Sequence, residues 1–205
     1  AQLNTVAGTN SGDSFSGSNA EKNTFFGYDS GTALTTGDNN TAVGHLAGKN
    51  FDTTSGHTAI GSYTLASGND TGNNNTAVGF YSANACIGTE NTFLGHSSGS
   101  GHTSGDENTA VGSMSLRADG SKTGNTAFGW VSGYSTTGNN NVLLGHRSGS
   151  PSGGTALTSG SNNIIIGSSA ASSSATVSNE ITLGDTNITK FRIPGLNFSI
   201  KDSTA

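Results

Sequence analysis

The five residues Asn40-Thr41-Ala42-Val43-Gly44 (NTAVG) decide the fold of this 205-residue chain, because the phrase keeps returning along it. Identical copies stand at Asn75–Gly79 and Asn108–Gly112. Related phrases ending in the same glycine bring the total to eleven: Asn4–Gly8, Asn23–Gly27, His57–Gly61, Asn91–Gly95, Asn125–Gly129, Asn141–Gly145, Asn163–Gly167 and Glu180–Gly184. Successive glycines are 16 to 22 residues apart, most often 17. A near-constant period of this length indicates a repeat architecture in which each copy forms one coil of a stack.

Composition alone would leave the fold class open. Gly, Ser, Thr and Asn make up 114 of the 205 residues, while only 30% are hydrophobic and 10% charged. Such a composition suits a disordered linker as well as a repetitive β structure, and it excludes a layered α/β enzyme with Ala- and Leu-rich helices. The periodic placement of the same residues favours the β structure.

Each column of the repeat predicts a place in the coil. We interpret the phrase as a short strand with one buried face, in which the large apolar residue before the glycine, such as Phe26 or Val43, points into the core on the same side as the Thr. We expect two short strands per coil, and hydrogen-bonded ladders of stacked Asn and Thr side chains. Three residues after the glycine comes a small column that should face the core: Ser30, Ala47, Thr64, Ser82, Ser98, Ser115, Ser132, Ser148 and Ala170.

These columns predict an all-β protein, a parallel β-solenoid with about 17 residues per coil. We expect a leading coil in residues 1–22, a repeat domain in residues 23–184 and a C-terminal cap or transition segment in residues 185–205. The long interval between Gly145 and Gly167 contains Pro151-Ser152-Gly153-Gly154, which predicts a projecting loop.

A homotrimer is the expected assembly, because one thin coil has little core. On the interpretation above, Phe25, Phe93, Leu143 and Ile165 lie on the strand face opposite the core. Side-by-side packing of several chains would bury these large apolar groups.

Charge and composition exclude several partners. The net charge is −5 and the eight basic residues are scattered singly, so no basic patch for nucleic acid is expected. No apolar run approaches the roughly 18 residues that a membrane span requires, so membrane insertion is not expected either. The single Cys86 excludes an intrachain disulfide and a cysteine-based metal site, and we expect no cofactor.

The phrase Asn-Thr-Ala-Val-Gly, followed three residues later by Ser or Ala, resembles the head repeats of YadA-like trimeric autotransporter adhesins. It is still more similar to repeat arrays in bacteriophage tail fibres. The closing stretch from Asn179 to Gly184 and from Phe191 to Gly195 resembles the exit segment of tail fibres of cyanobacterial phages. The resemblance covers residues 4–184 and implies a left-handed β-roll, three chains around one axis and attachment to a cell surface. Two features depart from the adhesin pattern: the period is longer, and no heptad run of a coiled-coil stalk is present.

Exposed aromatic residues are the candidate binding residues, because their rings stack on sugars or anchor protein interfaces. They are Tyr28, Phe80, Tyr81, Trp130 and Tyr134. Packing between the three chains is the alternative role for these rings.

Two other groups of residues suggest chemistry without establishing it. His45, His96 and His146 share the column after the glycine but lie three coils apart, roughly 14 Å, so one chain cannot bring two of them to one metal ion. Glu90 and Glu107 precede the Asn column in adjacent coils, at a spacing that a retaining glycosidase could use. Threefold symmetry could still bring three copies of one of these histidines together on the axis, but surface or inter-chain hydrogen bonding is their expected role, and we expect no metal site. No aromatic groove flanks the glutamate turns, so we expect no enzyme.

The expected function is therefore that of a phage tail fibre segment in the virion tail, non-enzymatic, which spaces other tail proteins or contacts a host surface polysaccharide or protein receptor. The head domain of a trimeric adhesin on a bacterial cell surface is the first alternative. An ice-binding solenoid is the second, suggested by the Thr column but disfavoured if the Thr side chains point inward.

Overall fold

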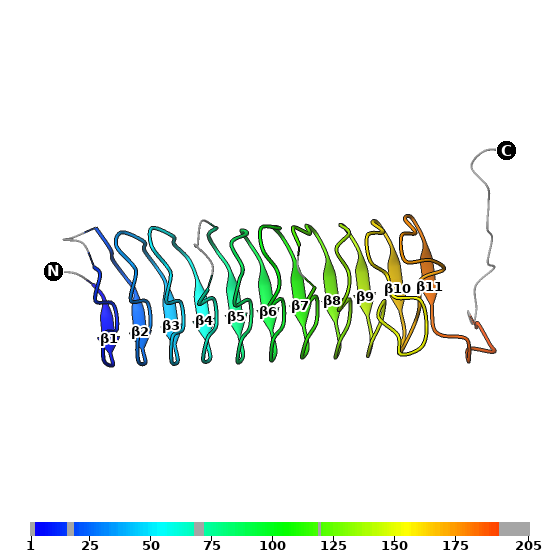
Figure 1. Ribbon diagram of the computed structural model, residues 1–205, viewed down its shortest axis with the longest axis horizontal. Helices are drawn as coiled ribbons and strands as arrows, with labels where there is room; N and C mark the ends of the chain where they lie inside the picture. The colour runs from blue at the N-terminus through cyan, green and yellow to red at the C-terminus, as the bar shows by residue number, and fades with distance from the viewer. Residues whose placement is uncertain (1–2, 16–18, 68–71, 119, 193–205) are drawn as a thin grey trace.

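The computed structural model describes residues 3–15, 19–67, 72–118 and 120–192. These residues form a parallel β-solenoid of about ten turns, drawn as a flat, elongated stack in Figure 1, and they contain no helix. Eleven three-residue strands pair in chain order, every one parallel to the next. The strands are β1 Thr5–Ala7, β2 Thr24–Phe26, β3 Thr41–Val43, β4 Thr58–Ile60, β5 Thr76–Val78, β6 Thr92–Leu94, β7 Thr109–Val111, β8 Thr126–Phe128, β9 Val142–Leu144, β10 Ile164–Ile166 and β11 Ile181–Leu183. The predicted solenoid class and coil length are confirmed.

Each described coil contains one strand, so the prediction of two strands per coil is wrong. After the strand the chain returns through consecutive turns. Residues with positive φ recur there, two residues after the phrase glycine, as at Leu46 (58°) and Val131 (58°). Left-handed residues at regular intervals break the extended conformation that a second strand needs.

The assignment of the strand faces is also wrong. The central strand residue points inward: Phe25, Phe93, Leu143 and Ile165 are fully buried. The residue before the glycine faces outward, so that Phe26 is 42% and Phe128 56% exposed. The Thr column lies on this outer face as well, half-buried or exposed. The interior is so narrow that five of the eleven strands place only Ala at the central position, and the larger column therefore stays outside.

The narrow core is filled by residues of complementary size on its two sides. A Cβ on Gly31 would lie 2.3 Å from the Phe25 ring, and one on Gly99 would lie 2.4 Å from the Phe93 ring. Gly31 and Gly99 each follow the central strand residue by six positions. Where the central strand residue is the small Ala59, the residue six positions further on is the buried Leu65. The small column three residues after the glycine is buried too, which confirms that prediction.

The phrase glycine allows neighbouring coils to approach closely. Gly27 has φ +141°, and a Cβ there would lie 2.3 Å from the carbonyl oxygen of Gly44 in the next coil. Gly44 and Gly79 stand in the same relation to the glycines that follow them. A side chain at this position would meet backbone, which explains why every phrase ends in glycine.

The predicted Asn ladder is confirmed and runs through the core. The Asn40 Oδ1 accepts the backbone N–H of His57 at 2.9 Å, while its Nδ2 donates to the Thr54 carbonyl across the coil at 2.8 Å. Asn91, Asn125 and Asn141 repeat both bonds. Each side chain thus links two coils and also ties the strand to the opposite turn.

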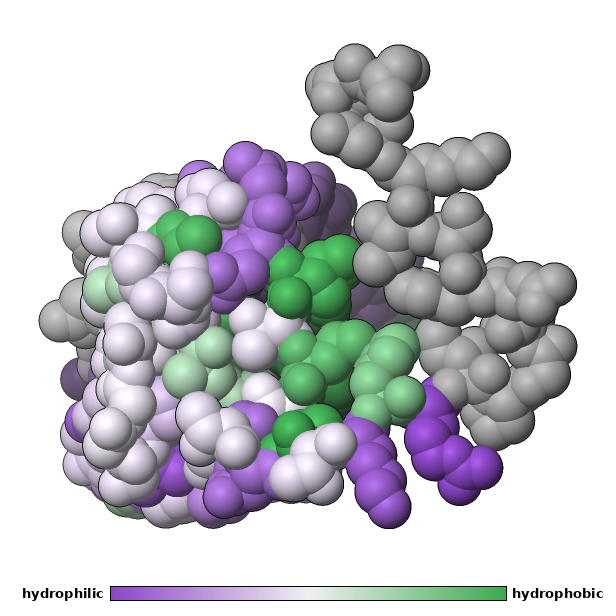
Figure 2. Space-filling view, turned by 90° about the vertical axis from the view of Figure 1, so that its right-hand side faces the viewer, coloured by the Kyte–Doolittle hydropathy of each residue, from purple (hydrophilic) through white to green (hydrophobic). Residues whose placement is uncertain are grey.

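The two ends of the chain differ. Strand β1 lies within residues 1–22 and pairs with β2, so this segment is a coil of the same sheet. Pro151–Gly154 forms a turn in the long ninth coil. At the other end β11 closes the sheet, and Figure 2 shows apolar side chains gathered there; Ile181, Leu183 and Ile188 are exposed. Residues 193–205 of the expected cap lie outside the described residues.

Candidate functional site

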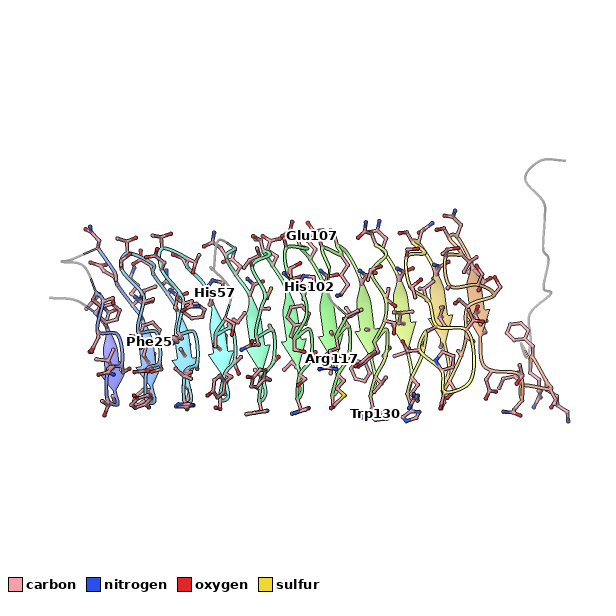
Figure 3. The ribbon with its side chains drawn as sticks, viewed as in Figure 1. Phe25, His57, His102, Glu107, Arg117 and Trp130 are labelled. Carbon is pink, nitrogen blue, oxygen red and sulfur yellow. The ribbon has the colours of Figure 1, made fainter. Side chains whose placement is uncertain are left out.

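Two opposite edges of the flattened coil have different chemistry. The edge that directly follows each strand carries aromatic and histidine side chains, and Trp130 marks it in Figure 3. The opposite edge carries Gly-Asp and Gly-Asn turns, and Glu107 marks it there. Between them, on the side away from the sheet, lies the return face, the surface of the turns that follow each phrase glycine.

The residues directly after the phrase glycine form a ring column. Each of its aromatic residues stacks on a histidine in the next coil: Tyr28 on His45 at 5.5 Å between ring centroids, Phe80 on His96 at 5.7 Å and Trp130 on His146 at 5.0 Å. A serine stands in the third coil, so an aromatic–His–Ser order repeats three times, as Tyr28/His45/Ser62, Phe80/His96/Ser113 and Trp130/His146/Ser168.

Tyr81 and Tyr134, two of the predicted binding residues, line one shallow depression of the return face, with a volume of about 390 Å³. Ser97 and Ser100 line it between them, and Asn84 lies on the Tyr81 side. Tyr134 is held by Arg117 of the preceding coil, which donates from Nη1 to the Tyr134 hydroxyl and places its Cζ 5.5 Å from the ring centroid. We call this the Tyr81 depression.

A second depression, of about 350 Å³, lies on the other side of Tyr134. Trp130, Arg147 and Pro151 line it together with Tyr134. The Arg147 Cζ lies 5.3 Å from the Trp130 ring, so an aromatic residue again holds a guanidinium. We call this the Trp130 depression.

Tyr28 and Phe80 line neither of these depressions. Both are about half exposed, at 51% and 50%, on the same edge. The structure therefore places three of the five predicted aromatic residues in the depressions. Phe80 packs on Tyr81, at 5.0 Å between ring centroids, as well as on His96, and Tyr28 stacks on His45.

His45, His96 and His146 are exposed, and each lies against a different ring. The structure does not bring them together within one chain. Among the described residues there is no group of three or more His, Cys, Asp or Glu side chains that could hold a metal ion.

Glu90 and Glu107 occupy equivalent turn positions at the edge opposite Trp130. Both have a positive φ, 61° and 58°, and both donate a backbone N–H to a carbonyl of the preceding coil. Asn39, Asn74 and Asn140 hold the same conformation at the same place in their coils. The two glutamates thus stand where the other coils carry a neutral residue or, at Lys22, a basic one.

His102 is one of the buried titratable groups of the described residues, together with His57 and Lys122. Its Nε2 lies 2.7 Å from the Gly105 carbonyl oxygen, to which it donates, and its ring packs on Phe93. Burial lowers the pKa of His102 to about 4, with the Lys122 charge adding to the effect and the Gly105 and Asp106 interactions opposing it. At a pH between this pKa and the ordinary value of 6.5, His102 is therefore neutral in the folded protein and protonated in the unfolded chain.

Acidification should weaken the fold through this residue. Between about pH 6.5 and pH 4 the unfolded state binds a proton that the folded state does not, so stability falls as pH falls. From pH 7.5 to pH 5 we expect wild type to lose about 2 kcal/mol more than His102→Leu, measured by urea unfolding. The exposed His96→Leu should keep the wild-type pH dependence. Equal losses in wild type and His102→Leu would contradict the prediction.

The outer face of the sheet is a second candidate surface. Its two outward columns form what we call the outer stripe, in which the first column is Thr in β1 to β8 and Val or Ile in β9 to β11. The second column is the large residue before the glycine: Phe26, Val43, Ile60, Val78, Leu94, Val111, Phe128, Leu144, Ile166 and Leu183. These apolar side chains, several of them 36–56% exposed, follow the whole length of the stack.

Arg117, Arg147 and Asn84 were missed as site residues because they look isolated in the sequence. The spacing between each arginine and its aromatic partner could have identified both arginines. Arg117 and Tyr134 are 17 residues apart, as are Trp130 and Arg147, and one coil length places such residues side by side.

Comparisons with protein-family models, with curated proteins and with solved structures find no match to this chain. Within the described part of the chain, no helical segment has the length and apolar character needed to cross a bilayer.

Proposed function

We propose that this chain is a non-enzymatic structural and host-attachment segment of a phage tail fibre, in which three copies associate along the outer stripe. The carrying observation is the outer stripe itself, a continuous apolar column from β2 to β11 whose large residues are half-buried in β5 to β7 and exposed in the other strands. Apolar surfaces of this extent on soluble proteins mark interaction sites. The eleven-strand stack adds the stiffness of a spacer, because every coil is paired with its neighbours.

A second copy of the chain suits the stripe better than an unrelated partner. The stripe repeats at every coil, so an identical chain in the same register offers the same apolar column at every level. Three such chains around one axis would bury the stripe and leave the ring column and the return face toward solvent. Many weak contacts, multiplied by three, would then provide avidity for a host surface.

The mass in solution tests this assembly. We expect sedimentation equilibrium to give three times the chain mass of 20.4 kDa for wild type. Val43→Glu combined with Val111→Glu should give the monomer mass, because it places two charges in the buried stripe. Asn139→Glu, on an exposed turn, is the matched control and should remain trimeric. A folded wild-type monomer would overturn the proposal.

One observation favours a second candidate, an ice-binding solenoid. The Thr column lies outward, beside the aliphatic column and on the same sheet face, whereas its expected inward direction had disfavoured this function. Thermal hysteresis of the wild-type protein, lost when Thr58, Thr76 and Thr92 are replaced by Glu, would favour ice binding. A trimeric wild-type protein without thermal hysteresis would eliminate the ice-binding candidate.

A further inference from the structure

The part of the return face that runs from the β5 coil to the β9 coil has the opposite charge character to the chain as a whole. The chain carries 13 acidic and eight basic residues. Yet the described residues of five successive turns, 79–84, 95–101, 112–118, 129–135 and 145–151, include two arginines, two histidines and no carboxylate. The nearby acidic residues Glu90, Asp106 and Glu107 belong to the turns of the opposite edge.

Neither arginine is neutralised by the protein. Within the described residues no Asp or Glu pairs with Arg117 or Arg147, and each guanidinium instead lies over an aromatic ring. A stacked guanidinium is held in one orientation while its N–H edge can still bind a carboxylate by two parallel hydrogen bonds. Both depressions thus present an oriented guanidinium that no carboxylate of the described residues neutralises, although one N–H group of Arg117, on Nη1, already donates to the Tyr134 hydroxyl.

The surroundings of Arg117 suit a sugar. Tyr81 and Tyr134 supply ring surfaces at the sides of the Tyr81 depression, and Ser97, Ser100 and Asn84 supply small polar groups that can bond hydroxyls. The depression is shallow and open, which suits one unit of a longer chain.

The second depression extends the first. Tyr134 lines both, so a ligand can continue from one to the other without leaving the surface. Arg117 and Arg147 belong to coils two steps apart, which places them on the order of 10 Å from each other along the axis. A polymer with regularly spaced acidic groups could meet both arginines.

We propose that the Tyr81 and Trp130 depressions together bind an acidic polysaccharide, in which sugar carboxylates meet Arg117 and Arg147 while sugar rings lie on Tyr81, Tyr134 and Trp130. The inference rests on the proposed role in host attachment and names the ligand class of that attachment.

The test is titration calorimetry of the full chain with oligogalacturonate, with neutral dextran and dextran sulfate as comparison ligands. We expect binding of oligogalacturonate, weakened tenfold or more in Arg117→Gln, because a charge-assisted hydrogen bond to the sugar carboxylate is lost. Tyr134→Ala should weaken it as well. Lys49→Gln is the matched control: Lys49 occupies the same coil position as Arg117, outside both depressions, and its loss should leave the affinity unchanged. Unfolding midpoints verify that each variant is folded.

Three results would overturn the inference: no binding of oligogalacturonate, equal binding of neutral dextran with no effect of Arg117→Gln, or equal losses in Lys49→Gln and Arg117→Gln. Binding of dextran sulfate alone would also overturn it, because the site would then select sulfate instead of carboxylate. The mass measurement separates this failure from failure of the proposed function. A trimer that does not bind oligogalacturonate leaves the tail fibre proposal standing. A monomer that binds oligogalacturonate overturns the proposed trimeric fibre segment but leaves the ligand site in place.

Discussion

Replacing Gly112 by alanine should destabilise the protein by about 4 kcal/mol, among the largest effects of any single substitution in this chain. Gly112 has φ +127°, and an added Cβ would lie 2.4 Å from the Gly129 carbonyl oxygen of the next coil. Alanine at this position therefore has two costs. Its backbone is strained at this positive φ, and its Cβ clashes with a main-chain carbonyl that cannot rotate away. Because the two coils pair along their strands, relief of the contact would separate β7 from β8.

Denaturant unfolding monitored by circular dichroism measures this effect. Gly153→Ala is the matched control, since Gly153 also has a positive φ, +83°, but an added Cβ there would have no neighbour within 4 Å. The free energy of unfolding of Gly153→Ala should fall only by the cost of backbone strain, about 1 kcal/mol. If Gly112→Ala proves no worse than Gly153→Ala, the close approach of coils is not what requires the glycine.

The second large effect is expected for Asn108→Ala in the ladder, at about 3 kcal/mol. The Asn108 Nδ2 donates to the Lys122 carbonyl at 2.6 Å, and its Oδ1 accepts the backbone N–H of Asn125 at 3.0 Å. All of these groups are buried, so alanine removes the bonds without admitting water to replace them.

Asn139→Ala provides the comparison for the ladder. The Asn139 Oδ1 also accepts a backbone N–H, from Thr123 at 2.8 Å, but the bond is exposed. Water can replace it, and the expected loss is below about 1 kcal/mol. Similar losses for Asn108→Ala and Asn139→Ala, in the same unfolding measurement, would show that burial of the ladder does not matter.

The error over the strand faces has a simple cause. A three-residue strand alternates only once, and strands such as Thr24–Phe26 and Ile164–Ile166 carry apolar residues on both faces. The column of larger residues, directly before the glycine, was therefore assigned to the core, although it faces outward. A better signal lies in the residues further on, because the two sides must together fill one narrow layer. Six residues on, Phe25 and Phe93 are matched by Gly31 and Gly99, and Ala59 by Leu65. Ala42 is instead followed by Gly48, and there the buried Phe51 fills the layer.

The candidate site was predicted in part. Tyr81, Trp130 and Tyr134 were expected to contact ligand, and the structure places all three in two adjoining depressions. Their arginine partners were not predicted, because Arg117 and Arg147 gain meaning only when coils of 17 residues bring each beside a ring.

The sequence by itself determined the solenoid, its coil length, the glycine at each close approach and the Asn ladder. These features satisfy a local requirement that recurs in every coil, so the requirement is visible as a period. Only the tertiary structure decided which strand face is buried, that the outer stripe is exposed and which side chains of neighbouring coils meet. Those outcomes depend on the width of the coil and on the register between coils, which no single phrase of the sequence contains.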